Sequence, residues 1–377
     1  MSRTRAKLLV LLVSASLLGL PSLSYAQTTG SHGEKGKRYD AEWKTLKALD
    51  PKYEVRQLTT SDALDNKMYL DVDPYVPSMN SVVFMSDRDG AENLYLMSLD
   101  DGSFRQVTAS DGLDGNHANV SAATEEAFFR DGRKIKRVSL RSPYKEQTVY
   151  TADDKYDIKG IVALTADGKT IALSLYDDGE SDLVTVDVDN GKQTKIKTIK
   201  GKVDHLLINP PGTKLLYHVY AEGPTEVGVV DIESKDKKIL TKSGEHGVHP
   251  FWADADNAAF VVKLDDKGPQ ERIVVYNTKK DKFTRFDIYE KGNHFAMNST
   301  GSLLQGDGQT PNDPYIYYFT LNENGSVEGK KMFKHDCSEA GRNNEDLHPH
   351  AAFINNTDLI FNSDRSGSGD VYLLRKK

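Results

Sequence analysis

Short apolar runs alternate with polar turns along most of the chain. One unit has apolar residues at 82–85, a polar turn at 87–90, a second apolar run at 94–96 and a third short segment at 105–108. Short alternating runs bounded by Asp, Gly and Ser predict β-strands joined by tight turns. No long segment has the 3.6-residue periodicity of an amphipathic helix. The pattern therefore predicts an all-β protein built from small repeated sheets.

The repeat recurs at a period typical of propeller blades. The unit near the C-terminus, at residues 359–374, closely matches the unit at residues 82–96. Successive units are spaced by 42–55 residues, with their apolar strands centred on Tyr95, Val138, Val186, Val229, Val275, Tyr317 and Tyr372. Propeller blades of four short strands repeat every 40–50 residues or so. We therefore predict a seven-bladed β-propeller over residues 53–377, with a two-sheet sandwich as the structural alternative.

The two ends of the repeat region are predicted to meet in one blade. Residues 55–59 match residues 105–108, the outer strand of a unit, although no inner strands precede them. The last unit has no outer strand of its own. We therefore expect the N-terminal strand to complete the last blade, which closes the ring and removes an exposed sheet edge. Residues 27–52 are expected to form a leader with a short helix near residues 41–49.

Residues 1–26 have the features of a cleavable export signal. A basic start precedes an apolar run at residues 8–20, and small residues stand three and one positions before a cleavage point after Ala26. The run is shorter than the roughly 20 residues that span a bilayer, which favours export over a membrane anchor. Cys337 is the only cysteine, so the sequence excludes an internal disulfide and a lipoprotein. We expect a periplasmic or secreted protein without stable membrane insertion.

Composition and motifs exclude several functional classes. A hydrophobic content of 38% supports a packed core, and a net charge of −7 argues against a general binder of nucleic acids or anionic membranes. The sequence has no Gly-x-Ser-x-Gly elbow, which excludes a propeller-capped serine peptidase. It also lacks phosphate-loop and dinucleotide-binding motifs. Nothing in the sequence indicates an oligomeric state.

Histidines occupy one register of the repeat. When the units are aligned on the turn after their first strand, the position five residues earlier is held by His117, His205, His249, His294 and His350. The two other units place Asp73 and Ile161 there. His348 precedes His350 by two residues, so both side chains point to the same side of a strand. Because the first strand of each blade lines the channel, we expect these six histidines to converge at one rim.

Two interpretations of these histidines differ in chemistry. In WD-type propellers a histidine bonds an Asp and a Trp of its own blade, but this chain has only two tryptophans for seven units; for a single histidine such as His117 or His205 a packing role remains an equal alternative. The strand pair His348 and His350, a third imidazole from His294 and the upstream Glu345 would form a nitrogen-rich metal site with room for water. Such ligands suit Mn, Fe or Zn.

Several short motifs carry a resemblance to a known family. They are Val55-Arg-Gln-Leu-Thr, Val248-His-Pro-Phe-Trp, Asn293-His-Phe, Lys334-His-Asp and His348-Pro-His with the strand at 359–365. In these motifs the chain resembles the oligogalacturonate lyases of polysaccharide lyase family 22, which are seven-bladed propellers with TolB-like repeats. The family holds a divalent metal, usually manganese, and the resemblance implies His294, His348 and His350 as ligands here. Glu345 stands where the family has a glutamine.

The resemblance implies β-elimination on short acidic oligosaccharides. His249 matches the family histidine of a His-x-Phe-Trp stretch and is the expected base, with His205 in reserve, because an imidazole titrates near neutral pH. His117 and Asp73 are expected to contact the substrate. The family's partner arginine has no counterpart, since residues 223–227 occupy its region. The alternatives are a non-catalytic TolB-like periplasmic scaffold and a lyase or epimerase for another acidic sugar.

Overall fold

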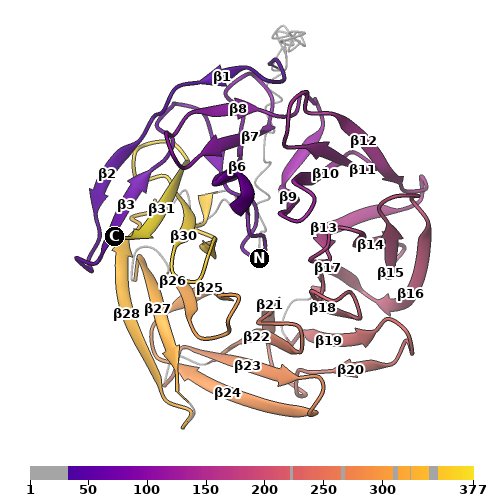
Figure 1. Ribbon diagram of the computed structural model, residues 1–377. Coiled ribbons are helices and arrows are strands. Elements are labelled where there is room, and N and C mark those ends of the chain that lie inside the picture. The colour runs from indigo at the N-terminus through magenta and orange to yellow at the C-terminus, as the bar shows by residue number, and fades with distance from the viewer. Residues whose placement is uncertain (1–32, 221–223, 265–267, 309–312, 323, 339–346) are drawn as a thin grey trace, which may run out of the picture. The chain divides into compact units, whose positions relative to one another are not determined.

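Seven antiparallel sheets are arranged radially as the blades of a β-propeller (Figure 1). The structure is a computed structural model and describes residues 33–220, 224–264, 268–308, 313–322, 324–338 and 347–377. The expected export signal, residues 1–26, lies outside the described residues. Within the described ranges, no helix has the length and hydropathy to cross a bilayer. The predicted fold class, an all-β seven-bladed propeller, is confirmed.

Blades 2 to 6 each consist of four strands that follow the chain from the channel outward. Blade 2 contains β9 (Leu113–Ser121), β10 (Glu126–Asp131), β11 (Lys134–Ser139) and β12 (Glu146–Thr151). Blade 3 contains β13 (Asp157–Leu164), β14 (Thr170–Asp177), β15 (Glu180–Asp187) and β16 (Gln193–Lys200). Blade 4 contains β17 (Lys202–Ile208), β18 (Lys214–Tyr220), β19 (Glu226–Asp231) and β20 (Lys237–Ile239).

Blades 5 and 6 continue this order. Blade 5 contains β21 (Gly247–Trp252), β22 (Asn257–Lys263), β23 (Glu271–Asn277) and β24 (Lys282–Ile288). Blade 6 contains β25 (Gly292–Met297), β26 (Leu304–Gly308), β27 (Tyr315–Leu321) and β28 (Val327–Lys334). The core lies between facing blades, where apolar side chains interdigitate; for example, Phe128 of blade 2 packs in one cluster with Leu173 and Val184 of blade 3.

Blade 1 has an interrupted inner edge. β4 (Asp65–Asn66) and β5 (Tyr75–Val76) both pair with β6 (Ser81–Ser86), which is followed outward by β7 (Asn93–Ser98), β8 (Phe104–Gln106) and β1 (Arg38–Tyr39). A short 3₁₀ helix, η1 (Pro77–Met79), precedes β6. Residues 67–74 therefore cross the channel wall without belonging to a regular strand.

Blade 7 combines both ends of the propeller. It contains β29 (Ala352–Phe353), β30 (Leu359–Ser363), β31 (Asp370–Lys376), β3 (Tyr53–Gln57) and β2 (Lys44–Lys47) in that order. β3 pairs antiparallel with β31 from Tyr53 opposite Lys376 to Gln57 opposite Tyr372. The Gln57 amide also donates a hydrogen bond to Asp370. The predicted closure by the N-terminal strand is confirmed.

The short helix expected near residues 41–49 is wrong. This segment contains β2, which pairs with β3 and places Leu46 opposite Val55. The pairing satisfies the backbone groups on the outer edge of β3, which a helix would leave exposed. Trp43 adds a cation–π contact, with the Arg56 guanidinium 4.9 Å from its ring centroid. Pairing with the otherwise unpaired edge of β3 therefore outweighs the local helix preference of residues 41–49.

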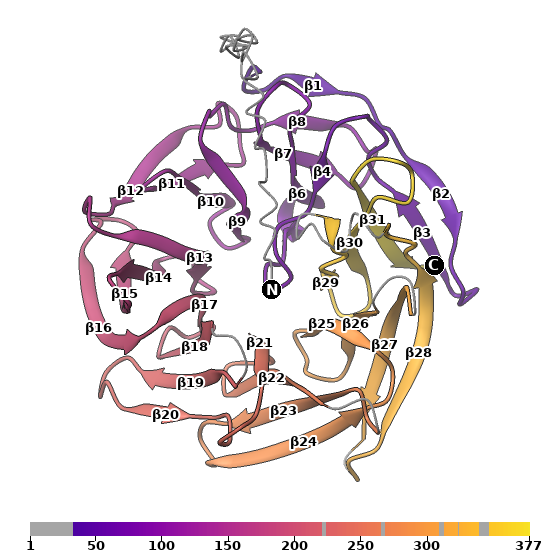
Figure 2. The ribbon, with the colours of Figure 1, turned by 180° about the vertical axis from the view of Figure 1, so that it is seen from behind.

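The first strands of blades 2 to 6 all contain a register irregularity. In these strands, which lie next to the centre in Figures 1 and 2, the ladder to the second strand is interrupted by a bulge. A bulge bends a strand and re-aims its side chains. At the bulge of β21, His249 has a φ of 47°, and His350, just before β29, has a φ of 42°. Both are left-handed conformations that non-glycine residues rarely adopt.

Candidate active site

Six histidines form a continuous series of ring contacts at the channel. Ring centroids are 4.4 Å apart for His294 and His350, 4.7 Å for His249 and His294, 6.1 Å for His205 and His249, and 5.6 Å for His205 and His218. His348 joins at 5.4 Å from His294. Five of the six histidines expected at one rim are thus brought together, and His218 is added to them.

Three of these histidines form a compact set of nitrogen donors. His294 lies in β25, and His348 and His350 lie on the segment that leads into β29. One ring nitrogen from each lies within 4.8 Å of the others. His294 and His350 are buried, and His348 is half-buried. Glu345, the fourth expected ligand, lies outside the described residues.

Asp307 in β26 holds His294 from behind. The backbone N–H of His294 donates to Asp307 Oδ1 at 2.8 Å, and its ring Nδ1 lies 3.0 Å from Asp307 Oδ2. Burial alone would raise the pKa of Asp307, but the charge and hydrogen bonds of His294 and the charge of His350 outweigh it and hold that pKa at about 2. The second ring nitrogen, Nε2, lies 3.0 Å from the Asn293 amide nitrogen.

The donor set fits a divalent metal. A carboxylate behind a histidine fixes the orientation and tautomer of the ring and is the usual second partner of a metal-binding imidazole. Here Asp307 engages Nδ1 of His294, and one ring nitrogen of His294 lies within 4.8 Å of donors from the other two rings. Three imidazoles with an ionised carboxylate behind one of them match the ligands that Zn, Mn and Fe accept. The residues present therefore fit the metal that the sequence implied.

His249 has the features of a neutral acceptor beside this set. Its Nδ1 is buried and has no hydrogen-bond partner among the described residues. Burial lowers the pKa of His249 well below its usual value, and the neighbouring charges of His294, Lys263 and His205 lower it further. The ring is therefore neutral and presents a lone pair. The bulge that orients the His249 side chain holds its backbone in the left-handed region, which costs strain energy.

His205 is more fully engaged. Its Nε2 lies 2.9 Å from the Tyr69 hydroxyl, and its Nδ1 lies 3.2 Å from Asp204 Oδ1. Tyr69 also packs against His350, with ring centroids 4.6 Å apart. Tyr69 thus connects two histidines that are far apart in sequence. Sequence reasoning missed it, because the segment 67–74 has no strand pattern.

Lys67 is a second residue that the sequence did not indicate. Its buried ammonium donates to three backbone carbonyls, those of Met68, Tyr69 and His350. Burial lowers the pKa of Lys67 to about 7, although the charges of Asp71, Asp307 and Asp73 raise it. Lys67 therefore ties the inner segment of blade 1 to the segment that carries His350. Lysine is usually a surface residue, and Lys67 belongs to no motif in the sequence, so sequence reasoning missed it.

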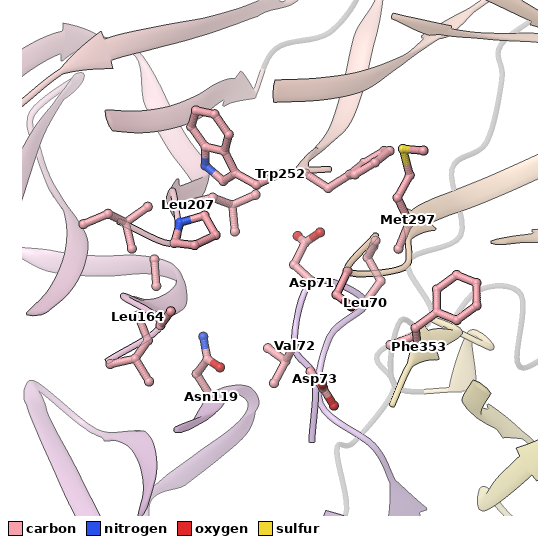
Figure 3. A pocket seen from close by; sticks show the side chains of 18 of the residues that line it. Leu70, Asp71, Val72, Asp73, Asn119, Leu164, Leu207, Trp252, Met297 and Phe353 are labelled. Atoms are coloured by element: carbon pink, nitrogen blue, oxygen red, sulfur yellow. The ribbon is translucent and has the colours of Figure 1, made fainter. Parts of the chain in front are cut away.

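Two of the expected substrate contacts lie elsewhere. His117 bonds Asp114 at 2.7 Å and lines a separate cavity of about 520 Å³, outside the series of histidine contacts. Asp73 lines a different cavity of about 310 Å³, into which Asp71 projects (Figure 3). This cavity is walled by residues that follow the histidines along the inner strands, such as Trp252, so it lies at the other end of the channel.

The structure thus does not bring Asp73 to the histidines. The position five residues before the turn does not identify the channel residue in blade 1, because the inner edge of this blade is split between β4 and β5. Tyr69, four residues earlier in the chain, lies beside His205 and His350 instead. In blade 3 the register residue Ile161 is buried in an apolar cluster that includes Tyr69.

No family model and no curated protein matches the chain in sequence. Among solved structures, an oligogalacturonate lyase from Vibrio parahaemolyticus aligns with a TM-score of 0.79 and 20% identity over 90% of this chain and 98% of that chain. An oligogalacturonate lyase in complex with manganese aligns with a TM-score of 0.81 and 21% identity over 91% of this chain and 98% of that one. TolB from Acinetobacter baumannii aligns with a TM-score of 0.46 and 12% identity over 71% of this chain and 64% of that chain. The two lyase alignments, at 20% and 21% identity, show that this chain shares the fold of these lyases.

Proposed function

We propose that this protein is a metal-dependent lyase that cleaves short uronic-acid oligosaccharides by β-elimination. The observation that carries the proposal is the pairing of a neutral histidine, His249, with the three-histidine set, at 4.7 Å between the rings of His249 and His294. The manganese complex of a structural neighbour named as an oligogalacturonate lyase supports the same chemistry. The enzyme would act in the periplasm or outside the cell, as the export signal at residues 1–26 predicts.

The metal would be held by His294, His348 and His350, with Glu345 as the proposed fourth ligand. When bound, a divalent cation such as Mn²⁺ would neutralise the substrate carboxylate and stabilise the negative charge that develops next to it. Asp307 fixes the His294 ring for this task through its contact with Nδ1. A local cation also offsets the acidity of the chain, whose net charge of −7 would otherwise repel a uronate.

His249 would act as the base. The C5 hydrogen of a uronate is weakly acidic because it is α to the carboxylate; a base takes this proton, the C5–H electron pair forms the C4=C5 double bond, and the C4–O bond to the neighbouring sugar breaks. His249 suits this role because its ring is neutral and Nδ1 has no hydrogen-bond partner among the described residues. Both ring nitrogens of His205 already have partners, so His249 is the better candidate of the two.

The charge near the base differs from that of the family. Where the resemblance implies an arginine, this chain has none, and the positive side chain that acts on His249 is Lys263 at the end of β22. Lys263 also bonds Glu271 at 3.0 Å, which fixes its position. We therefore propose that the substrate is a uronide whose carboxylate charge is neutralised mainly by the metal and only weakly by a side-chain cation.

The proposal is tested by incubating the purified protein with Mn²⁺ and a panel of short oligouronides. The unsaturated product absorbs in the ultraviolet, and we expect absorbance to rise with at least one substrate. His348→Ala and His249→Asn should each reduce the rate at least 100-fold, whereas the exposed variant Lys279→Ala should not. If the protein bound metal but formed no unsaturated product, the result would favour epimerisation, which NMR of the sugar would detect. If the protein bound no metal and formed no unsaturated product, the result would favour the non-catalytic scaffold.

A further inference from the structure

A second group of potential metal ligands lies in blade 4. Asp204 and His205 are neighbours in β17, and His218 is the cross-strand partner of His205 in β18. Consecutive strand residues normally point to opposite faces. The bulge between Val203 and His205 removes this alternation. As a result, the side chains of Asp204, His205 and His218 converge on one point.

The distances within this group match those around a metal ion. Asp204 Oδ1 lies 3.2 Å from His205 Nδ1 and 3.5 Å from His218 Nδ1. One donor atom from each residue lies within 4.8 Å of the others. Two donors bound at 2.0–2.2 Å in tetrahedral geometry stand about 3.4 Å apart. The three side chains therefore already have the spacing of a ligand set.

His218 gives an independent indication of a missing partner. It is only 3% exposed. Its Nδ1 lies 3.5 Å from Asp204 Oδ1, and its Nε2 has no hydrogen-bond partner among the described residues. A buried polar group without such a partner costs free energy. A cation bound to His218 and Asp204 would remove that cost.

The surroundings of His205 also suit a metal ligand. The Tyr69 hydroxyl, at His205 Nε2, orients the His205 ring toward Asp204 as an outer partner does in metal sites.

We propose that Asp204, His205 and His218 form a second divalent-cation site, separate from His294, His348 and His350. Two imidazoles and one carboxylate leave further coordination positions open and suit Mn²⁺, Fe²⁺ or Zn²⁺. Asp204 also lines the cavity of about 520 Å³, together with the basic residues Arg130, Lys159 and Lys202. An anionic group such as a carboxylate is therefore the ligand that would complete the site. This inference does not depend on the lyase activity.

The number of metal ions bound tests the proposal. The purified protein is stripped with a chelator, dialysed to equilibrium against Mn²⁺ or Zn²⁺ alone, and analysed for metal per chain. We expect two equivalents in the wild type, one in His218→Ala, one in His348→Ala, and none in the double variant. His246→Gln, a nearby histidine outside both groups, should keep two.

A variant that preserves shape guards against misfolding. Asp204→Asn keeps the volume and an acceptor oxygen for the imidazoles but removes the charge, and it should bind one equivalent with an unchanged melting temperature. One equivalent in the wild type that is lost in His348→Ala would overturn the proposal, as would two equivalents in both His218→Ala and Asp204→Asn. In that case the group is a hydrogen-bonded cluster that positions His205. Because His348→Ala reports on the other set alone, the two proposals fail separately.

Discussion

Asp307 is a single residue whose effect should be measurable apart from that of the ligands. It contacts both the backbone and the ring of His294 and does not belong to the three-histidine set. Loss of such an outer carboxylate typically weakens metal affinity 10–100-fold. We therefore expect Asp307→Asn to weaken Mn²⁺ binding by about this factor in a calorimetric titration. An unchanged affinity in a folded variant would show that Asp307 serves packing only.

Asp114 predicts a pH dependence of stability. It bonds His117 and Arg130, and although burial would raise its pKa, these partners hold that pKa at about 2, below the usual 3.8. A depressed folded-state pKa gives stability that is fully present above pH 4 and is lost as the pH falls toward 2. The contribution is on the order of 2 kcal/mol.

The measurement for Asp114 is urea unfolding at pH 6 and pH 3. Asp114→Asn should destabilise the protein at pH 6 and should narrow the difference in unfolding free energy between the two pH values. Asp153→Asn, on an exposed turn, is the control and should leave both values unchanged. Equal losses from Asp114→Asn at both pH values would mean that its carboxylate contributes no charge-dependent stability.

Single residues also show where sequence reasoning succeeds. The histidines at 205, 249, 294 and 350 were found because each occupies the same place in a repeated first strand. His218 was missed, since it lies on a second strand and joins the group only across the ladder to His205. Lys67 and Tyr69 were missed because the contacts that tie them to His350 and His205 span 283 and 136 residues of sequence, and no local pattern encodes such a contact.

At the level of elements, the bulge in β13 can be tested through Gly160. It has a φ of +68°, and a Cβ there would lie 2.0 Å from the Asp204 carbonyl oxygen. Gly179, in the turn between β14 and β15, also has a positive φ of +85° but has open space around it. Alanine at either position pays a backbone cost of about 1–2 kcal/mol, and only Gly160→Ala adds overpacking of about 1–3 kcal/mol.

Gly160→Ala should therefore lower the free energy of unfolding by more than Gly179→Ala does, as measured in urea. It should also reduce metal binding at Asp204, His205 and His218, because the clash falls on the backbone of Asp204. Equal losses of stability in the two variants would show that β17 can move away from β13 without a measurable cost in stability.

Strands were predictable where they are buried. Tyr95, Val138 and the five equivalent residues all lie in third strands, because a strand covered on both faces must be apolar. The segment at residues 44–47 is polar and lies at an outer edge, so its burial pattern carries no strand signal. Its conformation is decided by the unpaired edge of β3, which a local pattern does not contain.

For the whole molecule, we expect closure of the ring by β3 to contribute strongly to stability. A chain that begins at residue 58 would lack β1, β2 and β3 and would expose the edge of β31. We expect a large drop in melting temperature and association of exposed edges, seen by light scattering. A chain that begins at residue 48 would lose only β1 and β2 and would keep the pairing of β3 with β31, so its melting temperature should fall less. If both truncations melted alike, the pairing of β3 with β31 would contribute little.

Metal removal should act on the whole fold as well. The three-histidine set joins blade 6 to blade 7, so a bound ion would stabilise the junction beside the closure. A ligand at 100 times its dissociation constant adds about 2.7 kcal/mol to the free energy of unfolding. Calorimetric scans of the wild type with Mn²⁺ and with a chelator should differ accordingly. His294→Ala should show a smaller difference between the two conditions, because only the group of Asp204, His205 and His218 would still bind Mn²⁺.

The pairing of β3 with β31 also orders events in time. Gln57 and Asp370, which it joins, are 313 residues apart in sequence, and contacts of such long range form late. While the chain is being synthesised, β3 can pair with β2, but its other edge has no partner until β31 has emerged. For a chain with an export signal, as residues 1–26 predict, the ring therefore stays open at least until β31 has been synthesised, while the N-terminus is already available to the export machinery.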